Sequence, residues 1–102
     1  MADVPQAASV RPRVTVYVPS HNYGRFLAEA LDSVAAQSFG AWEVIAIIDG
    51  ASDETAAVAT GFAARHPDRV RIITNPTPRG LHACSNQALA EARGEYIMRL
   101  DA

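Results

Sequence analysis

The sequence is poor in cysteine, in aromatic residues and in net charge. It contains one cysteine, Cys84, and aromatic residues make up 7% of its 102 positions. A single cysteine excludes an internal disulfide framework and a cysteine-based zinc site, and it fits a reducing compartment. The formal net charge is only −2, so the chain lacks the basic surface that nucleic-acid binding requires.

Long apolar runs are also missing. No stretch approaches the roughly 20 residues that span a bilayer, and the first 13 residues contain no apolar run of a signal peptide. With 49% hydrophobic and 20% charged residues, the composition is that of one small folded domain. We expect residues 1–12 to be a flexible N-terminus, residues 13–102 to form the domain, and the chain to be cytoplasmic. Any association with a membrane would be made by C-terminal regions outside this sequence.

Four short apolar runs alternate with three amphipathic segments. Leu27, Ala30, Leu31 and Val34 show the i, i+3, i+4, i+7 spacing of one helix face. The predicted strands are 14–18, 44–48, 70–74 and 96–100, and the predicted helices are 25–37, 55–65 and 81–92. This βαβαβαβ pattern predicts an α/β fold with a parallel sheet and helices packed on its faces.

Ligands of such sheets bind at the carboxyl ends of the strands. Here those ends carry residues 19–22, 49–53 and 75–80, and Asp101. The G-x-x-x-x-G-K-[ST], G-x-G-x-x-G and G-x-S-x-G motifs are all missing at these positions. Their absence argues against a P-loop NTPase, an ordinary NAD-binding domain and an α/β-hydrolase.

Three carboxylates, Asp49, Asp53 and Asp101, follow predicted strands. A carboxylate accepts hydrogen bonds from ribose hydroxyls or from a base N–H, and it also binds a hard divalent ion that bridges phosphates. The set therefore favours a nucleotide diphosphate with a metal over proton transfer. The residues taken singly allow plainer roles: Asp53 suits a helix cap, Arg79 a solvated loop charge, and Ser20 a turn.

The ordered series of motifs resembles the opening of GT-A glycosyltransferases of family 2, from about Val14 to the last residue. The resemblance is carried by residues 18–27, 31–39, 42–55, 79–81, 92–97 and 99–102, together with Asn75 and Asn86. It implies a Rossmann-like three-layer α/β/α domain whose mostly parallel sheet has the strand order 3-2-1-4. The chain would be the N-terminal nucleotide-binding portion of such a domain.

The resemblance also implies roles for individual residues. Pro19, Ser20, His21 and Asn22 would line the nucleotide, partly through their backbone groups. Asp49 would contact the base or ribose, and Arg79 and Gly80 would lie near the base or the diphosphate. Asp101 would be the first acid of a D-x-D motif, close to the ribose and to a Mn²⁺ or Mg²⁺ ion. No residue of this chain is assigned a catalytic role.

Two departures from the family pattern bear on function. The family usually has two adjacent acids after the second strand, whereas here Ile48 precedes Asp49 or one residue is deleted after Ser52. The sequence also ends before the second acid of the D-x-D motif and before any general base. We expect the full enzyme to transfer a sugar with inversion from a UDP-sugar to a carbohydrate or lipid-linked acceptor, and the isolated chain to be inactive.

The alternative is a non-catalytic nucleotide-binding or interaction module that reuses the fold. In a complete domain later elements would cover the fourth strand, so in this chain we expect that strand to expose apolar surface at the edge of the sheet. Such edges promote self-association, so we expect a homo-oligomer.

Overall fold

The computed structural model describes residues 12–21, 24–37, 40–50 and 53–100. The described residues form strands β1 (Val14–Ser20), β2 (Trp42–Asp49), β3 (Val70–Asn75) and β4 (Tyr96–Arg99), and helices α2 (Gly24–Ala35), α3 (Asp53–Arg65) and α4 (Leu81–Glu91). Of the segment predicted to be flexible, residues 1–11 lie outside this description. Among the helices described, none is both long and apolar enough to cross a membrane.

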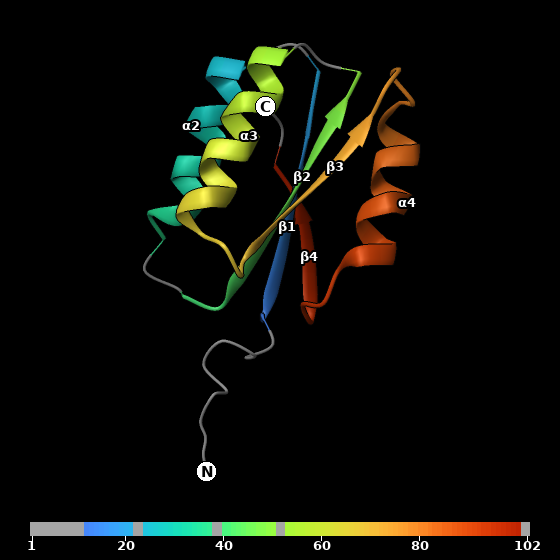
Figure 1. The fold of residues 1–102 in the computed structure, drawn as a ribbon. Coiled ribbons are helices and arrows are strands. Elements are labelled where there is room, and N and C mark those ends of the chain that lie inside the picture. The colour runs from blue at the N-terminus through green and yellow to red at the C-terminus, as the bar shows by residue number, and fades with distance from the viewer. Residues whose placement is uncertain (1–11, 22–23, 38–39, 51–52, 101–102) are drawn as a thin grey trace.

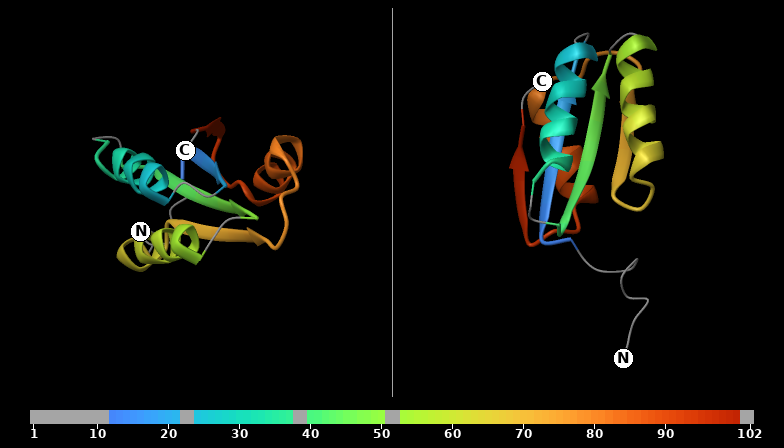
Figure 2. Two further views of the ribbon diagram at one scale, coloured as in Figure 1. Left: turned by 90° about the horizontal axis from the view of Figure 1, so that it is seen from above. Right: turned by 90° about the vertical axis from the view of Figure 1, so that its left-hand side faces the viewer.

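The four strands form one parallel sheet in the order β3-β2-β1-β4. Helices α2 and α3 lie side by side over one face of the sheet, and α4 covers the other face (Figure 1). The view from the side in Figure 2 shows β4 and β3 at the two edges of the sheet. The predicted three-layer fold and its strand order are therefore confirmed.

Strand β2 is an inner strand whose middle, residues 44–48, is apolar on both faces. All eight of its residues are buried, as expected for a strand between two helical layers. Val44, Ala46 and Ile48 pack beneath α2 and α3, whereas Ile45 and Ile47 pack beneath Cys84 and Ala88 of α4. The predicted apolar face of the first helix is buried as well, through Leu27, Leu31 and Val34.

Strand β1 continues through Pro19, where the sequence predicted its end. Pro19 pairs with Ile47, and Ser20 pairs with Ile48. In this ladder the odd-numbered residues of β1 turn their backbone groups toward β4, because the carbonyl of Tyr17 accepts from the N–H of Leu100. An N–H group at position 19 would point toward β4 but beyond Arg99, the last residue of that strand. Proline at this position therefore removes no hydrogen bond between the strands.

A buried polar network lies where the strands begin, at the amino-terminal end of the sheet. Glu43 is 3% exposed. Its carboxylate accepts from Thr15 Oγ1 at 2.6 Å, from Arg71 Nη2 at 2.7 Å and from the backbone N–H of Arg93 at 2.8 Å. Thr15 Oγ1 accepts in turn from the N–H of Gly94 at 2.9 Å. A Cβ at position 94 would lie 2.7 Å from the backbone nitrogen of Thr15, so glycine lets the turn before β4 approach β1 this closely.

Candidate functional site

Asp49 is the centre of the carboxyl-terminal edge of the sheet. It ends β2, it is 8% exposed, and it lies beside Asn75 at the end of β3. Its Oδ1 atom accepts from Asn75 Nδ2 and from the backbone N–H of Arg79, each at 2.9 Å, and Oδ2 accepts from the N–H of Gly80 at 3.0 Å. The carboxylate thus binds the loop that precedes α4.

The same hydrogen bonds decide the charge of Asp49. Burial by itself would raise the pKa of this carboxyl group, but the N–H of Arg79, the amide of Asn75 and the N–H of Gly80 together outweigh burial and lower the pKa below its usual value. Asp49 is therefore an anion at neutral pH, and with the thiol of Cys84 as a further donor its roughly four acceptor positions are all used within the chain.

Asn75 and Gln87 extend the hydrogen-bond network behind this carboxylate. Asn75 Nδ2 donates to Gln87 Oε1 at 3.0 Å, and Gln87 Nε2 donates to Asn75 Oδ1 at 2.8 Å. Neither residue was assigned a role in the site from the sequence. The sequence did contain a signal for Asn75, because this residue directly follows a predicted strand and neighbouring parallel strands end at the same side of a sheet. In the structure Asn75 pairs with Asp49. Nothing in the sequence distinguishes Gln87 from other polar residues of a helix.

Gly50 allows the chain to leave β2 directly beneath the loop of residues 76–80. Its φ is 71°, and its N–H donates to the carbonyl of Asn75 at 2.9 Å. A Cβ at this position would lie 2.4 Å from Cδ of Pro78, a separation that atoms do not tolerate. Gly80, with φ 90°, completes the loop, so two glycines shape the entrance to α4.

His21 lies at the end of β1 and contacts the same edge. Its Nδ1 atom is 2.8 Å from the carbonyl oxygen of Asp49. Because a carbonyl only accepts, Nδ1 carries the proton and Nε2 of the neutral ring is an acceptor. His21 is exposed, so its ring is open to solvent beside Asp49.

The structure thus brings together His21, Asp49, Arg79 and Gly80 of the predicted set. Pro19 and Ser20 are buried at the end of β1, so contact with a ligand would fall to their backbone groups. Within the described ranges, Ser20 Oγ is the buried side-chain oxygen that has no hydrogen-bond partner. Asn22 and Asp101, the other predicted site residues, lie outside the described residues.

Ile48, which precedes Asp49 at the end of β2, belongs to the core. It is 1% exposed and packs beneath α2 and α3. Asp49 faces the α4 side, since its partners Arg79 and Gly80 lead into α4. The two neighbours therefore serve different layers, and Ile48 adds no polar group to the site.

The described residues do not fit a divalent metal. In residues 12–21, 24–37, 40–50 and 53–100 no three His, Cys, Asp or Glu side chains come close enough to hold an ion. Asp49 faces N–H donors, which repel a cation from both of its oxygens. A metal would thus depend on Asp101, as the resemblance implied, and on further ligands.

Cys84 lies beneath Asp49 and is expected to be unreactive. Burial raises the pKa of its thiol to about 11, and the negative charge of Asp49 and a thiol–carboxylate hydrogen bond act in the same direction. Relative to the usual value of 9.0, this leaves about a hundredfold less thiolate at pH 8. Iodoacetamide should therefore label the native chain at least about a hundred times more slowly than the urea-unfolded chain. Equal rates would contradict this burial.

The comparisons with known proteins agree on one family. The sequence model described as Glycosyl transferase family 2 matches residues 15–102. The chain is 39% identical over 90 residues to a protein of Bacillus subtilis named "Putative glycosyltransferase EpsE", and 33% identical over 90 residues to a chondroitin synthase of Escherichia coli. Each match covers 88% of this chain but only 32% and 13% of those proteins.

Solved structures show the same fold. The mannosyltransferase PcManGT from Pyrobaculum calidifontis, in complex with GDP-Man and Mn²⁺, superposes with a TM-score of 0.80 and 31% identity, over 92% of this chain and 28% of that one. A segment of TarS from S. aureus, residues 1–349 in complex with UDP-GlcNAc, superposes with a TM-score of 0.78 and 27% identity, over 87% of this chain and 26% of that one. This chain thus spans about a third or less of the length of the proteins it matches.

Proposed function

Because the chain belongs to glycosyl transferase family 2, we propose that it is the nucleotide-binding part of an enzyme that transfers a sugar from a nucleotide diphosphate sugar to an acceptor. The donor we propose is a UDP-sugar, and the acceptor is a carbohydrate or a lipid-linked sugar. The match over residues 15–102 is the observation that carries this proposal. PcManGT with GDP-Man and TarS with UDP-GlcNAc support the class of donor.

The carboxyl edge of the sheet suits the binding of a nucleotide. His21 presents Nε2 as an acceptor for a ribose hydroxyl or a base N–H. The exposed guanidinium of Arg79 suits a diphosphate. Asp49 contacts both segments, since its carbonyl accepts from the ring Nδ1 of His21 and its carboxylate accepts from the backbone N–H of Arg79. In this proposal Asp49 positions the site through its hydrogen bonds within the chain.

The proposed reaction is a direct displacement with inversion. The acceptor hydroxyl attacks the anomeric carbon, the bond to the diphosphate breaks, and a base removes the hydroxyl proton. A divalent ion, when bound, would neutralise the leaving diphosphate. The residues described here bind and orient the donor, and none of them is proposed as the base.

A non-catalytic interaction module is the second candidate, and the hydrogen bonds and burial around Asp49 favour it. Ile48, the neighbour of Asp49, is buried and adds no polar group, and the acceptor positions of Asp49 are used inside the chain. A chain with this site would keep the fold and bind no nucleotide. The two candidates therefore differ in a property that can be measured on the 102-residue chain.

Calorimetric titration with UDP, with and without Mn²⁺, tests the proposal. We expect saturable binding of UDP, and GDP titrated in parallel tests the choice of base. Arg79→Gln should weaken binding by about three- to tenfold, the loss of one exposed charge-assisted contact. Arg65→Gln is the matched control, because it removes the same charge from the end of α3 and should leave binding unchanged.

The outcomes separate the two candidates. Binding that Arg79→Gln weakens and Arg65→Gln does not would support the nucleotide site at this edge. Absence of heat with both UDP and GDP at millimolar concentrations would contradict nucleotide binding by this chain and favour the interaction module. Tighter binding of GDP than of UDP would replace the proposed uridine donor with a guanosine donor.

A further inference from the structure

Two side chains of α4 bind the residues that end β2 and β3. Gln87 and Asn75 exchange two hydrogen bonds, from Asn75 Nδ2 to Gln87 Oε1 at 3.0 Å and from Gln87 Nε2 to Asn75 Oδ1 at 2.8 Å. Cys84, three residues before Gln87 and therefore on the same side of the helix, donates its thiol proton to the carboxylate of Asp49. Helix α4 is thus tied to both strand ends.

The charge of Asp49 decides which way round the amide of Asn75 lies. An ionised carboxylate only accepts, so the Nδ2 atom of Asn75 has to face Asp49 Oδ1, at 2.9 Å. Nδ2 carries two protons, and the second one goes to Gln87 Oε1. Gln87 Nε2 donates to the remaining atom of this amide, Oδ1. Gln87 therefore holds Asn75 in the one orientation in which Asn75 donates to Asp49.

The same carboxylate holds the loop before α4. Asp49 Oδ1 accepts from the N–H of Arg79, and Oδ2 accepts from the N–H of Gly80. Both bonds need the carboxylate in one orientation, and the bond from Asn75 helps to set it. Gln87 thus acts on this loop through two intermediate side chains.

We infer that Gln87 is a positioning residue of the nucleotide site, which acts through Asn75 and Asp49 to hold Arg79 and Gly80 in the conformation that binds the diphosphate of UDP. The ligand in this inference rests on the proposed function, whereas the held loop rests on the hydrogen bonds alone. A purely structural tie between α4 and β3 is the plainer role. It would affect the stability of the whole chain and leave the N–H groups of the loop as they are.

Gln87→Met tests the inference, because methionine matches glutamine in length and has no amide. Hydrogen bonds to a carboxylate are short and strong, so they shift the NMR signals of the amide protons of Arg79 and Gly80 downfield. In Gln87→Met these two signals should move upfield, while those of Ile45 and Ile47 in β2 stay in place. The dissociation constant of UDP should rise by about three- to tenfold, since the apparent affinity falls with the fraction of chains whose loop is held.

Gln87→Glu separates hydrogen bonding from packing. At neutral pH the new carboxylate accepts from Asn75 Nδ2 but has no proton for Asn75 Oδ1. Once protonated, its O–H group replaces the N–H of glutamine, and both bonds to Asn75 form again. The nearby charge of Asp49, which stays ionised, raises the pKa of the new group. The signals of Arg79 and Gly80 should therefore be displaced at about pH 7 and return toward those of the original chain at about pH 5.

Ala90 provides matched controls on the same helix. It is exposed and lies three residues beyond Gln87, so Ala90→Met and Ala90→Glu introduce the same side chains away from Asn75. The neighbouring charges on this part of α4 belong to Glu91 and to Arg71, which pair at 3.1 Å. Ala90→Glu places a carboxylate beside that pair, so it also reports any effect of pH on these charges. Both variants should leave the loop signals and the affinity for UDP unchanged.

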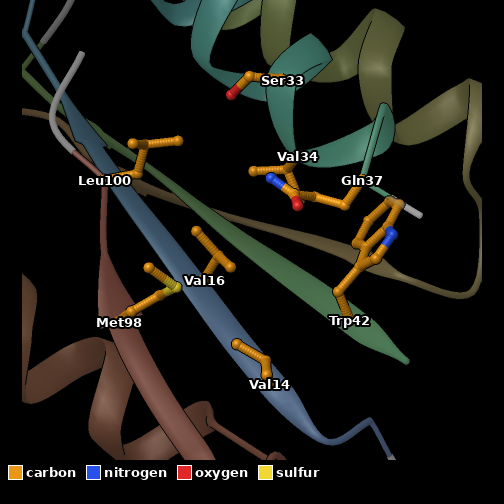
Figure 3. A pocket seen from close by; sticks show the side chains of 8 residues that line it. All are labelled: Val14, Val16, Ser33, Val34, Gln37, Trp42, Met98 and Leu100. Atoms are coloured by element: carbon orange, nitrogen blue, oxygen red, sulfur yellow. The ribbon is translucent and has the colours of Figure 1, made fainter. Parts of the chain in front are cut away.

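A third control lies on the opposite face of the sheet. Ser33 of α2 lines a largely apolar hollow of about 270 Å³ between α2, β1 and β4 (Figure 3). Helix α4 covers the other face, so Ser33→Ala removes a polar group that has no path to Asp49 through Asn75. It should change neither the loop signals nor the binding of UDP.

The outcomes decide each part of the inference. A folded Gln87→Met chain with the loop signals of the original chain would overturn it, and so would a displacement in Gln87→Glu that is the same at pH 7 and pH 5. Displaced signals with unchanged affinity for UDP would overturn the link to the nucleotide. If the original chain binds no UDP, the proposed function fails, and the signals still decide whether Gln87 holds the loop. Thermal melts report folding, and Gln87→Glu decides alone if Gln87→Met does not fold.

Discussion

Gly50→Ala should lower the free energy of unfolding by about 3 kcal/mol or more. The left-handed φ of 71° alone costs a side chain about 1 kcal/mol. The new Cβ would also lie 2.4 Å from Cδ and 2.6 Å from the backbone nitrogen of Pro78, so the loop of residues 76–80 has to move. That movement breaks the bonds from Arg79 and Gly80 to Asp49. Urea denaturation followed by circular dichroism measures the loss.

Two other glycines separate the causes. Gly80 has φ 90°, but a Cβ added there would meet no atom within 4 Å, so Gly80→Ala should cost only about 1 kcal/mol. Gly61 lies within α3, where the nearest atom is Arg65 Nη1 at 3.8 Å, and Gly61→Ala should stabilise by about 0.5–1 kcal/mol. A Gly50→Ala chain as stable as Gly80→Ala would contradict the close contact with Pro78.

Asp49→Ala should cost about 3–5 kcal/mol and abolish any binding of UDP. The variant leaves the N–H groups of Arg79 and Gly80 and the amide of Asn75 without their acceptor, and bonds to a charged group contribute about 1.5–3 kcal/mol each. Asp49→Asn keeps the shape and one oxygen, so it should lose less. Asp68→Ala is the control, because Asp68 is exposed in the turn before β3 and should change stability by less than about 0.5 kcal/mol.

The acid dependence of stability offers an independent check on Asp49. Its pKa is lowered in the folded state, so the unfolded chain takes up this proton first as the pH falls. The stability that the carboxylate contributes is fully present above its unfolded pKa, about 3.9, and is lost as the pH falls through the lower folded pKa. The difference in unfolding free energy between the original chain and Asp49→Asn should therefore shrink below about pH 4. A constant difference from pH 7 to pH 3 would refute the role of this charge.

The order of strands and helices was readable from the sequence because burial imposes a period on apolar residues. Leu27, Leu31 and Val34 recur at helical spacing, and the run before Asp49 is apolar throughout. The ends of the strands were less readable. Glu43 belongs to β2, yet a charged residue predicts exposure, and its burial depends on Thr15 and Arg93, which are distant in sequence.

Part of the site could be predicted from the same apolar pattern. Asp49 stood out because it follows the apolar run, and its place at the carboxyl edge follows from parallel topology. That its oxygens bind Arg79 and Gly80 through backbone N–H groups was not readable, since every residue except proline has such a donor. Gln87 was missed because a helix surface carries many polar residues and its pairing with Asn75 depends on the packing of α4.

The place of β1 in the sheet has a consequence for synthesis on the ribosome. Its first neighbour, β2, follows soon after, but the bond from Gly94 to Thr15 joins residues 79 positions apart. At a synthesis rate of about 5–20 residues per second, β1 has only one neighbouring strand for roughly 4–16 s, until β4 is made. During that interval Val16 and Val18 lie next to an open edge. The nascent chain is therefore most prone to aggregate, and most in need of a chaperone, after β2 has formed and before β4 emerges.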